Sequence, residues 1–492
     1  MKVLFSFFIC YSVFAGSNSR IEMRQTDALH LVNTKIPLFE DIDNTTSAKN
    51  NSGSTRLEPI WESRTLYTWL EPQILSAKGA MHPRISCDAS DNALCIWIIE
   101  TNQGFGPQIA EKTLSSTWNA ALNLSQSDGV DVHHAYAAQI SHDLQGNATA
   151  LWCDIDQSGR TMLASAEKNM GQSWNHSESP APSKNNLSNH DLEPLLAINK
   201  NGNAISLWKR VDCHGHANLY FSVKNSPQNW SEPSILLKDT LFFDPALVIN
   251  DDGEAIACWI NAEGNTNLLQ AAFYSPNKGW STPINLSVEQ RNSWFNKNHL
   301  DVNCFSVCMN SVGKAACAWA TYDAKIYVVE TENGTEWTEP RSLFINEAGT
   351  LPDIAIDELG NIAISWIGFF KQLMIRTAFK KQNENMFYTS TLSTFDEDIS
   401  KTQTPYFDPH IKFDKDGNLL CVWAKYKNGT MFIQESMKPA RKNWLKTQDI
   451  CRSRKTAGEF QIAFDASQNP LIVWLEGDDE IFRVRAVSGL KK

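Results

Sequence analysis

The stretch Ile85-Ser-Cys-Asp88-Ala-Ser-Asp91-Asn92-Ala-Leu-Cys-Ile-Trp97 decides the fold, because a block of this form recurs eight times along the chain. Asp or Asn stands nine residues before the final Trp of every copy, and Gly stands six residues before it in six copies. The period of about 54 residues indicates a repeat architecture. The final tryptophans are Trp97, Trp152, Trp208, Trp259, Trp319, Trp366, Trp423 and Trp474.

Each block is typical of a β-hairpin. Apolar residues alternate before the Asp or Asn, which is the period of a half-buried strand. Asp or Asn opens the turn by bonding the backbone two residues on, and Gly supplies the positive φ of a tight hairpin loop. Asp91 and Gln468 replace this Gly in the first and last copies.

A second signature, Trp-x-x-Pro-x-x-Leu, lies between the blocks, as in Trp69…Pro72…Leu75, and one more strand-like run separates the two. Each unit therefore holds four strands, which predicts an all-β, eight-bladed β-propeller. The last unit has no Trp-x-x-Pro strand, whereas the segment around Trp69 precedes the first hairpin. We expect that N-terminal strand to complete the last blade and close the ring. An open β-solenoid is the alternative.

The ends and the composition set the domain organisation. Residues 1–15 predict a secretory signal peptide, residues 16–60 a flexible leader, and residues 61–492 the propeller. We therefore expect an exported chain, secreted, periplasmic or at the cell surface, with no transmembrane segment, and a monomer. The net charge of −11 argues against a nucleic-acid partner, because phosphate contacts need clustered Lys and Arg.

The pattern Pro-x-Ile-x-x-Asp-x-x-Gly-Asn-Ala-x-x-x-Trp resembles the repeat of exported bacterial β-propellers over residues 66–487. The turn Glu167-Lys-Asn-Met-Gly171-Gln-Ser-Trp174 is also similar to a degenerate Asp-box of the sialidase-like superfamily. That resemblance implies an arginine triad, a Tyr/Glu nucleophile pair and an Asp acid. Pro83-Arg84-Ile85 is similar to the first arginine motif of the superfamily, but no second or third arginine occupies an equivalent strand start.

The loops that lead into the innermost strands supply the candidate ligand-binding residues. Acids or His recur fifteen residues before the hairpin Trp, where they either form a ring that binds a cation or polar ligand or cap their own turns. Histidines in these loops are candidate metal ligands, but no paired-ligand motif accompanies them. The candidates are His82, Arg84, His133, His134, His190, Glu193, Asp244, Trp294, His299, Asp408 and His410.

The hairpin tryptophans and the cysteines favour structural roles. A Trp at the same place in every unit packs between blades, although it could also stack a sugar ring. Cys95, Cys317 and Cys421 stand two residues before such a Trp and act as small apolar residues. The register places Ile85 opposite Cys95, so we expect mostly reduced thiols, with Cys213 and Cys451 as possible exceptions.

These features predict a non-catalytic binding scaffold for a protein or carbohydrate ligand. No catalytic residue, metal site or cofactor is assigned from the sequence. The alternatives are a sialidase-like glycoside-processing enzyme and a structural envelope or surface protein. An arginine cluster with two carboxylates in the central pocket would favour the enzyme.

Overall fold

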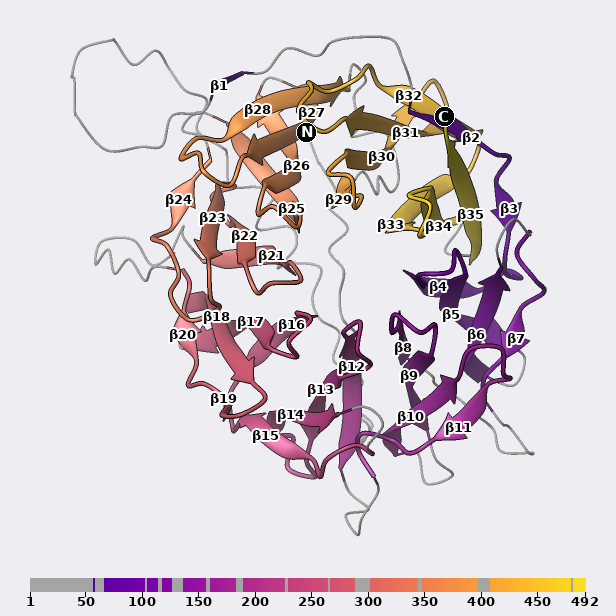
Figure 1. Cartoon of the computed structure of the whole chain (residues 1–492), viewed down its shortest axis with the longest axis vertical. Helices are drawn as coiled ribbons and strands as arrows, with labels where there is room; N and C mark the ends of the chain where they lie inside the picture. Colours follow the sequence, from indigo (N-terminus) through magenta and orange to yellow (C-terminus); the bar gives the residue numbers. More distant parts are fainter. Residues whose placement is uncertain are drawn as a thin grey trace.

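Eight antiparallel sheets stand around a central axis in the computed structural model of the chain (Figure 1). The structure describes residues 56–57, 66–101, 104–113, 117–125, 136–155, 160–182, 189–225, 229–263, 266–287, 301–343, 347–370, 372–395, 408–478 and 481–492. Within these ranges the fold is all-β, so the predicted eight-bladed β-propeller is confirmed. The described part of the chain contains no helix that could cross a membrane.

The first four blades follow the chain in order, each from its innermost to its outermost strand. Blade 1 comprises β4 (Ala80–Cys87), β5 (Ala93–Thr101), β6 (Gly104–Lys112) and β7 (Leu122–Asn123). Blade 2 comprises β8 (Tyr136–His142), β9 (Ala148–Ile155), β10 (Thr161–Lys168) and β11 (Asn175–Ser177). Blade 3 comprises β12 (His190–Ile198), β13 (Ala204–Val211), β14 (Ala217–Lys224) and β15 (Ser234–Leu237). Blade 4 comprises β16 (Phe242–Ile249), β17 (Ala255–Glu263), β18 (Thr266–Ser275), β19 (Gly279–Trp280) and β20 (Ile284–Asn285).

The next three blades follow the same strand order, whereas the last unit of the chain supplies only the first three strands of blade 8. Blade 5 comprises β21 (Val302–Met309), β22 (Ala315–Thr321), β23 (Ile326–Thr331) and β24 (Arg341–Ser342). Blade 6 comprises β25 (Ala348–Ile356), β26 (Ile362–Phe370), β27 (Gln372–Lys380) and β28 (Tyr388–Thr394). Blade 7 comprises β29 (His410–Phe413), β30 (Leu419–Lys427), β31 (Thr430–Lys438) and β32 (Gln448–Ser453). Blade 8 contributes β33 (Thr456–Phe464), β34 (Pro470–Asp478) and β35 (Ile481–Lys491).

The N-terminal segment completes blade 8, as predicted. Strands β2 (Tyr67–Trp69) and β3 (Gln73–Ile74) both pair antiparallel with β35, and Tyr67 lies opposite Lys491. The edge that β35 would otherwise expose is thereby covered. One further strand was not expected: β1 (Arg56–Leu57), within the predicted leader, pairs in parallel with β28 of blade 6. The predicted signal peptide lies outside the described residues.

The hairpin turns show the predicted chemistry. In blade 1, Oδ1 of Asp88 accepts hydrogen bonds from the amides of Ser90 (2.7 Å) and Asn92 (2.9 Å). The residue six before the Trp has a positive φ in all eight turns. Asp91 and Gln468, which replace Gly there, adopt φ values of 61° and 63°.

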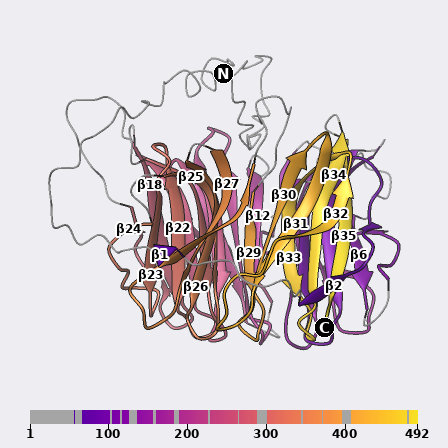
Figure 2. The same cartoon turned by 90° about the horizontal axis from the view of Figure 1, so that it is seen from above.

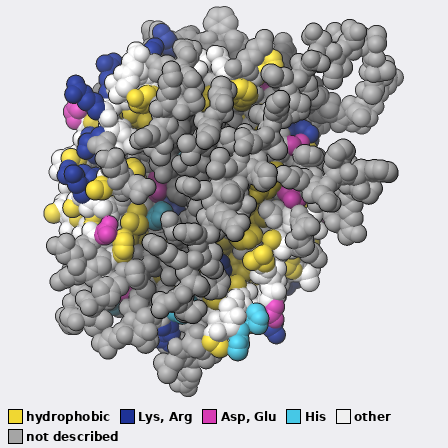
Figure 3. All heavy atoms as spheres, turned by 180° about the vertical axis from the view of Figure 1, so that it is seen from behind, with side chains coloured by type: hydrophobic (Ala, Val, Ile, Leu, Met, Phe, Trp, Pro, Cys, Tyr) yellow, Lys and Arg dark blue, Asp and Glu magenta, His cyan; other side chains and the backbone are white. Residues whose placement is uncertain are grey.

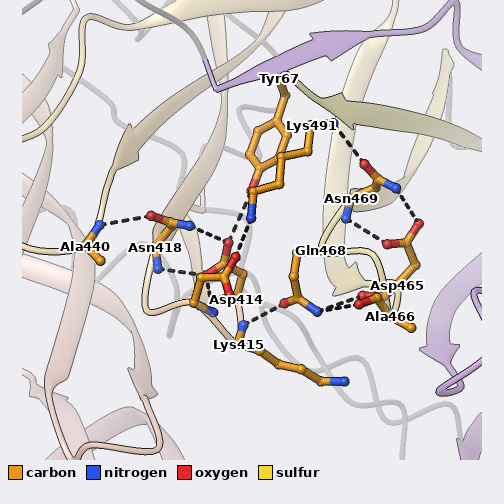
Figure 4. A network of polar contacts seen from close by, with 11 residues as sticks. Tyr67, Asp414, Lys415, Asn418, Ala440, Asp465, Ala466, Gln468, Asn469 and Lys491 are labelled. Atoms are coloured by element: carbon orange, nitrogen blue, oxygen red, sulfur yellow. Dashed lines mark hydrogen bonds and ion pairs between the residues drawn. The ribbon is translucent and has the colours of Figure 1, made fainter.

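These two exceptions also connect neighbouring blades. Asp91 of blade 1 accepts hydrogen bonds from the amide (2.7 Å) and hydroxyl (2.8 Å) of Ser467 in blade 8. Oε1 of Gln468 accepts a 2.7 Å bond from the amide of Lys415 in blade 7, within the network drawn in Figure 4. Both side chains therefore strengthen the part of the ring where its two ends meet.

A substitution at Gly417 tests the turn geometry. Its φ is 78°, and an added Cβ would meet only ordinary van der Waals neighbours, at 3.7 and 3.8 Å. Gly417→Ala should therefore lower the free energy of unfolding by about 1 kcal/mol through backbone strain alone. Gly417→Asn should cost less, because Asn tolerates this region. Urea unfolding measures the free energy of unfolding of both variants. An equal decrease for Ala and Asn would contradict the interpretation that the positive φ at Gly417 causes the strain.

The hairpin tryptophans pack in the core, as the structural interpretation predicts. All eight have exposed fractions of 2% or less. Trp259 of blade 4, for example, shares a cluster with Ile205 and Leu207 of blade 3. Ile85 lies opposite Cys95, as the register predicts, and the ten cysteines of the described residues are free thiols.

Candidate functional site

The innermost strand of each blade carries the candidate residues near its start. Seven of these strands show a register shift there, the mark of a β-bulge. The residue fifteen before the Trp is commonly the strained one, with φ between 47° and 53° despite being non-Gly. These residues are His82, Ala137, Glu193, Asp244, Leu351 and Glu459. We call this end of the channel the strand-start mouth, and the end with the Asp/Asn turns the turn mouth.

Asp353, which sequence analysis missed, joins three innermost strands. Its Oδ1 accepts hydrogen bonds from the Ser306 hydroxyl of β21 (3.1 Å) and from the amide of Ile354 (3.0 Å). Its Oδ2 accepts a bond from the amide of Ile411 in β29 (2.9 Å) and lies 3.6 Å from Nδ1 of His410. Asp353 stands thirteen residues before Trp366, the position that Arg84 and His410 occupy in their own blades. This shared spacing is the sequence feature that could have identified Asp353 as a candidate.

His410 lies beside Asp353, and the charge of a second carboxylate, that of Asp408, also acts on it. Burial acts to lower the pKa of its imidazole, but the hydrogen bond with Asp353 and the charges of Asp353 and Asp408 outweigh burial and raise that pKa. For the Asp408 carboxyl, burial instead raises the pKa, and the charge of His410 opposes that shift. The His410 imidazole and the Asp408 carboxyl therefore interact electrostatically at the channel mouth.

Arg84 and His82 approach this group from blade 1. Nη1 of Arg84 donates to the carbonyl of Pro83 (3.0 Å). Burial lowers the pKa of the guanidinium, and the charge of Glu459 in blade 8 opposes that shift. Nδ1 of His82 lies 3.3 Å from Oε2 of Glu459. Of the predicted residues, the structure thus brings His82, Arg84, Asp408 and His410 together.

Lys412 is the second residue that sequence analysis missed. It lies two positions after His410 on β29, and Nζ donates to the carbonyl of Ile462 in blade 8 (3.2 Å). Its side chain is exposed and lines the channel cavity. Desolvation by the surrounding channel walls lowers the pKa of the ammonium, and the charge of Asp353 opposes that shift. No repeated feature marks Lys412 in the sequence.

A cavity of about 480 Å³ runs along this part of the channel. Its walls come from β16, β21, β25, β29 and β33, and Asp353, His410, Lys412 and Gln461 supply its polar lining. Val248, Val307, Ile354 and Phe460 are among its apolar residues. We call His82, Arg84, Asp353, Asp408, His410, Lys412, Glu459 and Gln461 the polar sector.

The other predicted acids form a separate group in blades 3 and 4. Burial raises the pKa of both Glu193 and Asp244, and the charge of Lys209 opposes both shifts. Nζ of Lys209 lies 3.9 Å from Oε1 of Glu193. Glu193, Asp244 and Glu459 thus interact with charged side chains rather than with the amides of their own turns. The predicted acidic ring is divided into two unlike parts.

The remaining predicted residues do not join the polar sector within the described structure. Nδ1 of His190 accepts a hydrogen bond from the amide of Thr161 (3.2 Å), which places this ring at the seam between blades 2 and 3. His133, His134, Trp294 and His299 lie outside the described residues. The described ranges hold no group of three or more His, Cys, Asp or Glu that could bind a metal ion.

Exposed apolar side chains lie on blades 4 to 6 at the strand-start mouth. Figure 3 shows this face, where hydrophobic and charged side chains of described residues are both visible. The turn mouth faces the other way, with the chain end at Lys492 (Figure 2). We call the following exposed residues the apolar arc: Leu241, Phe243, Tyr322, Leu351 and Phe369.

Comparisons with known proteins reveal likeness in structure only. No family matches the sequence, and no curated protein matches it. Similar solved structures include the polysaccharide lyase Uly1 (10% identity, TM-score 0.43, covering 77% of this chain and 94% of that chain). The NanB sialidase from Streptococcus pneumoniae is similar over 81% of this chain and 83% of its own (10% identity, TM-score 0.37). The WD40 domain of SCAP from fission yeast is similar over 85% of this chain and 98% of its own (10% identity, TM-score 0.45). At these values the likeness carries no argument about activity.

Proposed function

We propose that this chain is an exported, non-catalytic binding protein that holds a glycan at the strand-start mouth. The observation that carries the proposal is the channel cavity of about 480 Å³, which lies inward of this mouth and is lined by both polar and apolar side chains. Ligand sites of this size are concave, mostly apolar, and oriented by a few polar groups. A rigid ring with long connections at one mouth is a suitable scaffold for recognition.

The apolar arc supports a glycan as the ligand. Phe243 and Tyr322 expose 44% of their surface each, on neighbouring blades at the mouth. Sugar rings offer C–H faces to such side chains, while their hydroxyls can donate to and accept from polar groups. The arc and the polar sector together supply both kinds of contact around one channel.

A glycan array with the purified full chain tests this proposal. We expect binding to a limited set of glycans, and Phe243→Ala and Tyr322→Ala should each weaken it at least tenfold. Leu359→Ala is the matched control, because Leu359 is 65% exposed but lies at the turn mouth. An array without binding, or unchanged binding by both aromatic variants, would overturn the proposal and favour a protein partner.

A glycoside-processing enzyme is the second candidate. Three carboxyl groups, those of Asp353, Asp408 and Glu459, lie in the polar sector with Arg84, and two of them contact imidazoles. Such acid–base pairs can transfer protons. Release of new reducing ends from any bound polysaccharide, lost in Asp353→Asn, would favour the enzyme over the binding protein.

A further inference from the structure

We propose that the polar sector is an oxyanion site, which binds a carboxylate, sulfate or phosphate group carried by the ligand. This inference deepens the proposed function, on which it rests for the rest of the ligand. Its core is the channel wall formed by blades 7, 8 and 1. What this wall can bind depends on which of its hydrogen-bonding groups are already engaged and which are open to the channel.

The carboxylate of Asp353 is fully engaged by the protein. Both oxygens of Asp353 accept hydrogen bonds, from Ser306 and Ile354 on one side and from Ile411 on the other. The Nδ1 atom of His410 lies beside the second oxygen. A carboxylate in this state has little capacity left for a cation or for a ligand hydroxyl. Asp353 therefore orients the wall rather than receiving the ligand.

The other two acids of the polar sector, Glu459 and Asp408, also interact with protein groups. Oε2 of Glu459 faces the imidazole of His82 at 3.3 Å. Burial raises the pKa of Asp408, and the charge of His410 opposes that shift. Both residues stand at the rim of the mouth, two positions before the wall residues Gln461 and His410. The acids thus orient or neutralise cationic partners at the entrance.

The donors of the wall, by contrast, are mostly open. Within the described residues, the Arg84 guanidinium makes one hydrogen bond, to the carbonyl of Pro83, and has five N–H donors. Lys412 makes one, to the carbonyl of Ile462, and has three. The side chain of Gln461 makes none within the same ranges. A wall whose central carboxylate is engaged and whose cationic donors are open is complementary to an acceptor-rich, negatively charged group.

These donors converge although they come from three blades. Lys412 of blade 7 reaches across the channel wall to the carbonyl of Ile462 in blade 8. The charge of Arg84 in blade 1 in turn acts on His410 in blade 7. Gln461 lies between them on β33 and lines the same cavity. An anion in this enclosed site would gain more from each charge-assisted bond than in water.

Calorimetric titration of the full chain tests the oxyanion site directly. The probes are sodium acetate, sulfate, phosphate and glucuronate, at a constant ionic strength set with chloride, and glucose is the neutral control. We expect saturable binding of at least one anion and none of glucose. Lys412→Gln and Arg84→Gln should each weaken that binding at least tenfold. Absence of saturable binding by every anion would overturn the proposal.

Two further variants guard against misfolding and non-specific charge effects. Lys412→Arg keeps the charge and should retain most of the affinity, so it reports on the site even if Lys412→Gln does not fold. Lys200→Gln is the matched control, because Lys200 pairs with Asp251 (2.7 Å) at the turn mouth. Equal loss of anion binding in Lys200→Gln and Lys412→Gln would overturn the assignment to the channel.

The glycan array separates failure of this inference from failure of the proposed function. Anion binding that depends on Lys412, with no glycan bound on the array, would preserve the oxyanion site and overturn the glycan proposal. Suppose instead that neutral glycans bind, that none of the four anions competes with them, and that Lys412→Gln leaves this binding unchanged. That result would preserve the glycan proposal and overturn the oxyanion site. Acidic glycans displaced by the same anion that binds in calorimetry would support both.

Discussion

Glu435→Gln should make the protein more stable at alkaline pH, by about 3 kcal/mol at pH 8.5. Glu435 lies on β31, where its side chain is only 1% exposed. Its Oε1 accepts hydrogen bonds from Nε1 of Trp69 (3.3 Å) and Nε2 of Gln448 (2.8 Å), whereas its buried Oε2 has no partner. Burial raises the pKa of this carboxyl to about 7, against the opposing effect of the two hydrogen bonds. Ionisation of Glu435 therefore destabilises the fold because it buries a charge that these two hydrogen bonds compensate only in part.

The direction of the pH dependence follows from the raised pKa. The folded protein binds the Glu435 proton more tightly than the unfolded chain does, so this group stabilises the fold fully below about pH 4.5. That stabilisation is lost as the pH rises to the folded pKa of about 7. Because Gln cannot ionise, the free energies of unfolding of wild type and Glu435→Gln should diverge as the pH rises from about 4.5 to about 7.

Urea unfolding from pH 4.5 to 8.5 measures this difference. Glu339→Gln, at an exposed glutamate of blade 5, is the control and should follow the wild type throughout. A constant difference between Glu435→Gln and wild type across the pH range would show that Glu435 does not titrate in it.

Trp259→Ala should lower the free energy of unfolding by about 3–5 kcal/mol, the usual cost of removing a fully buried Trp. The side chain is 0% exposed and packs between blades 3 and 4, among Leu207 and Phe242. Its Nε1 also donates to Oε1 of Gln270 (3.1 Å). The substitution leaves a cavity at a seam between blades, where rigid sheets cannot close in to fill it.

Trp280→Ala is the comparison within the same blade. Trp280 lies in the outermost strand β19 and is half-buried, so its loss should lower the unfolding midpoint less. Thermal and urea unfolding measure both variants. A stable Trp259→Ala that had lost glycan binding would instead support the sugar-stacking interpretation of the hairpin tryptophans.

Most of the fold could be predicted from local sequence because each blade repeats the same local rules. The Asp or Asn, the residue with positive φ and the buried Trp all act within one hairpin, so thirteen consecutive residues specify it. The missing fourth strand of the last unit likewise identified β2 as its replacement. Strand β1 had no such signal, because its partner β28 lies more than 300 residues away and the pairing uses only two residues.

The candidate site was less predictable because its side chains find their partners in other blades. His82, Glu193 and Asp408 share one position in the repeat, yet one pairs with Glu459, another lies near Lys209 and the third acts on His410. The repeat reveals which residues are equivalent but not which neighbours they meet. Asp353 was overlooked for this reason: its role depends on Ser306 and Ile411, which come from the blades on either side.

Completion of blade 8 by β2 has a consequence for the order of folding. Tyr67 pairs with Lys491, so the chain between them must be in place before this sheet can form. Closing so long a loop costs entropy that only the finished contacts repay, which slows the final step. We therefore expect the joining of the two ends to be the last step of folding, and a chain that lacked β35 to leave Tyr67 and Trp69 without their partners.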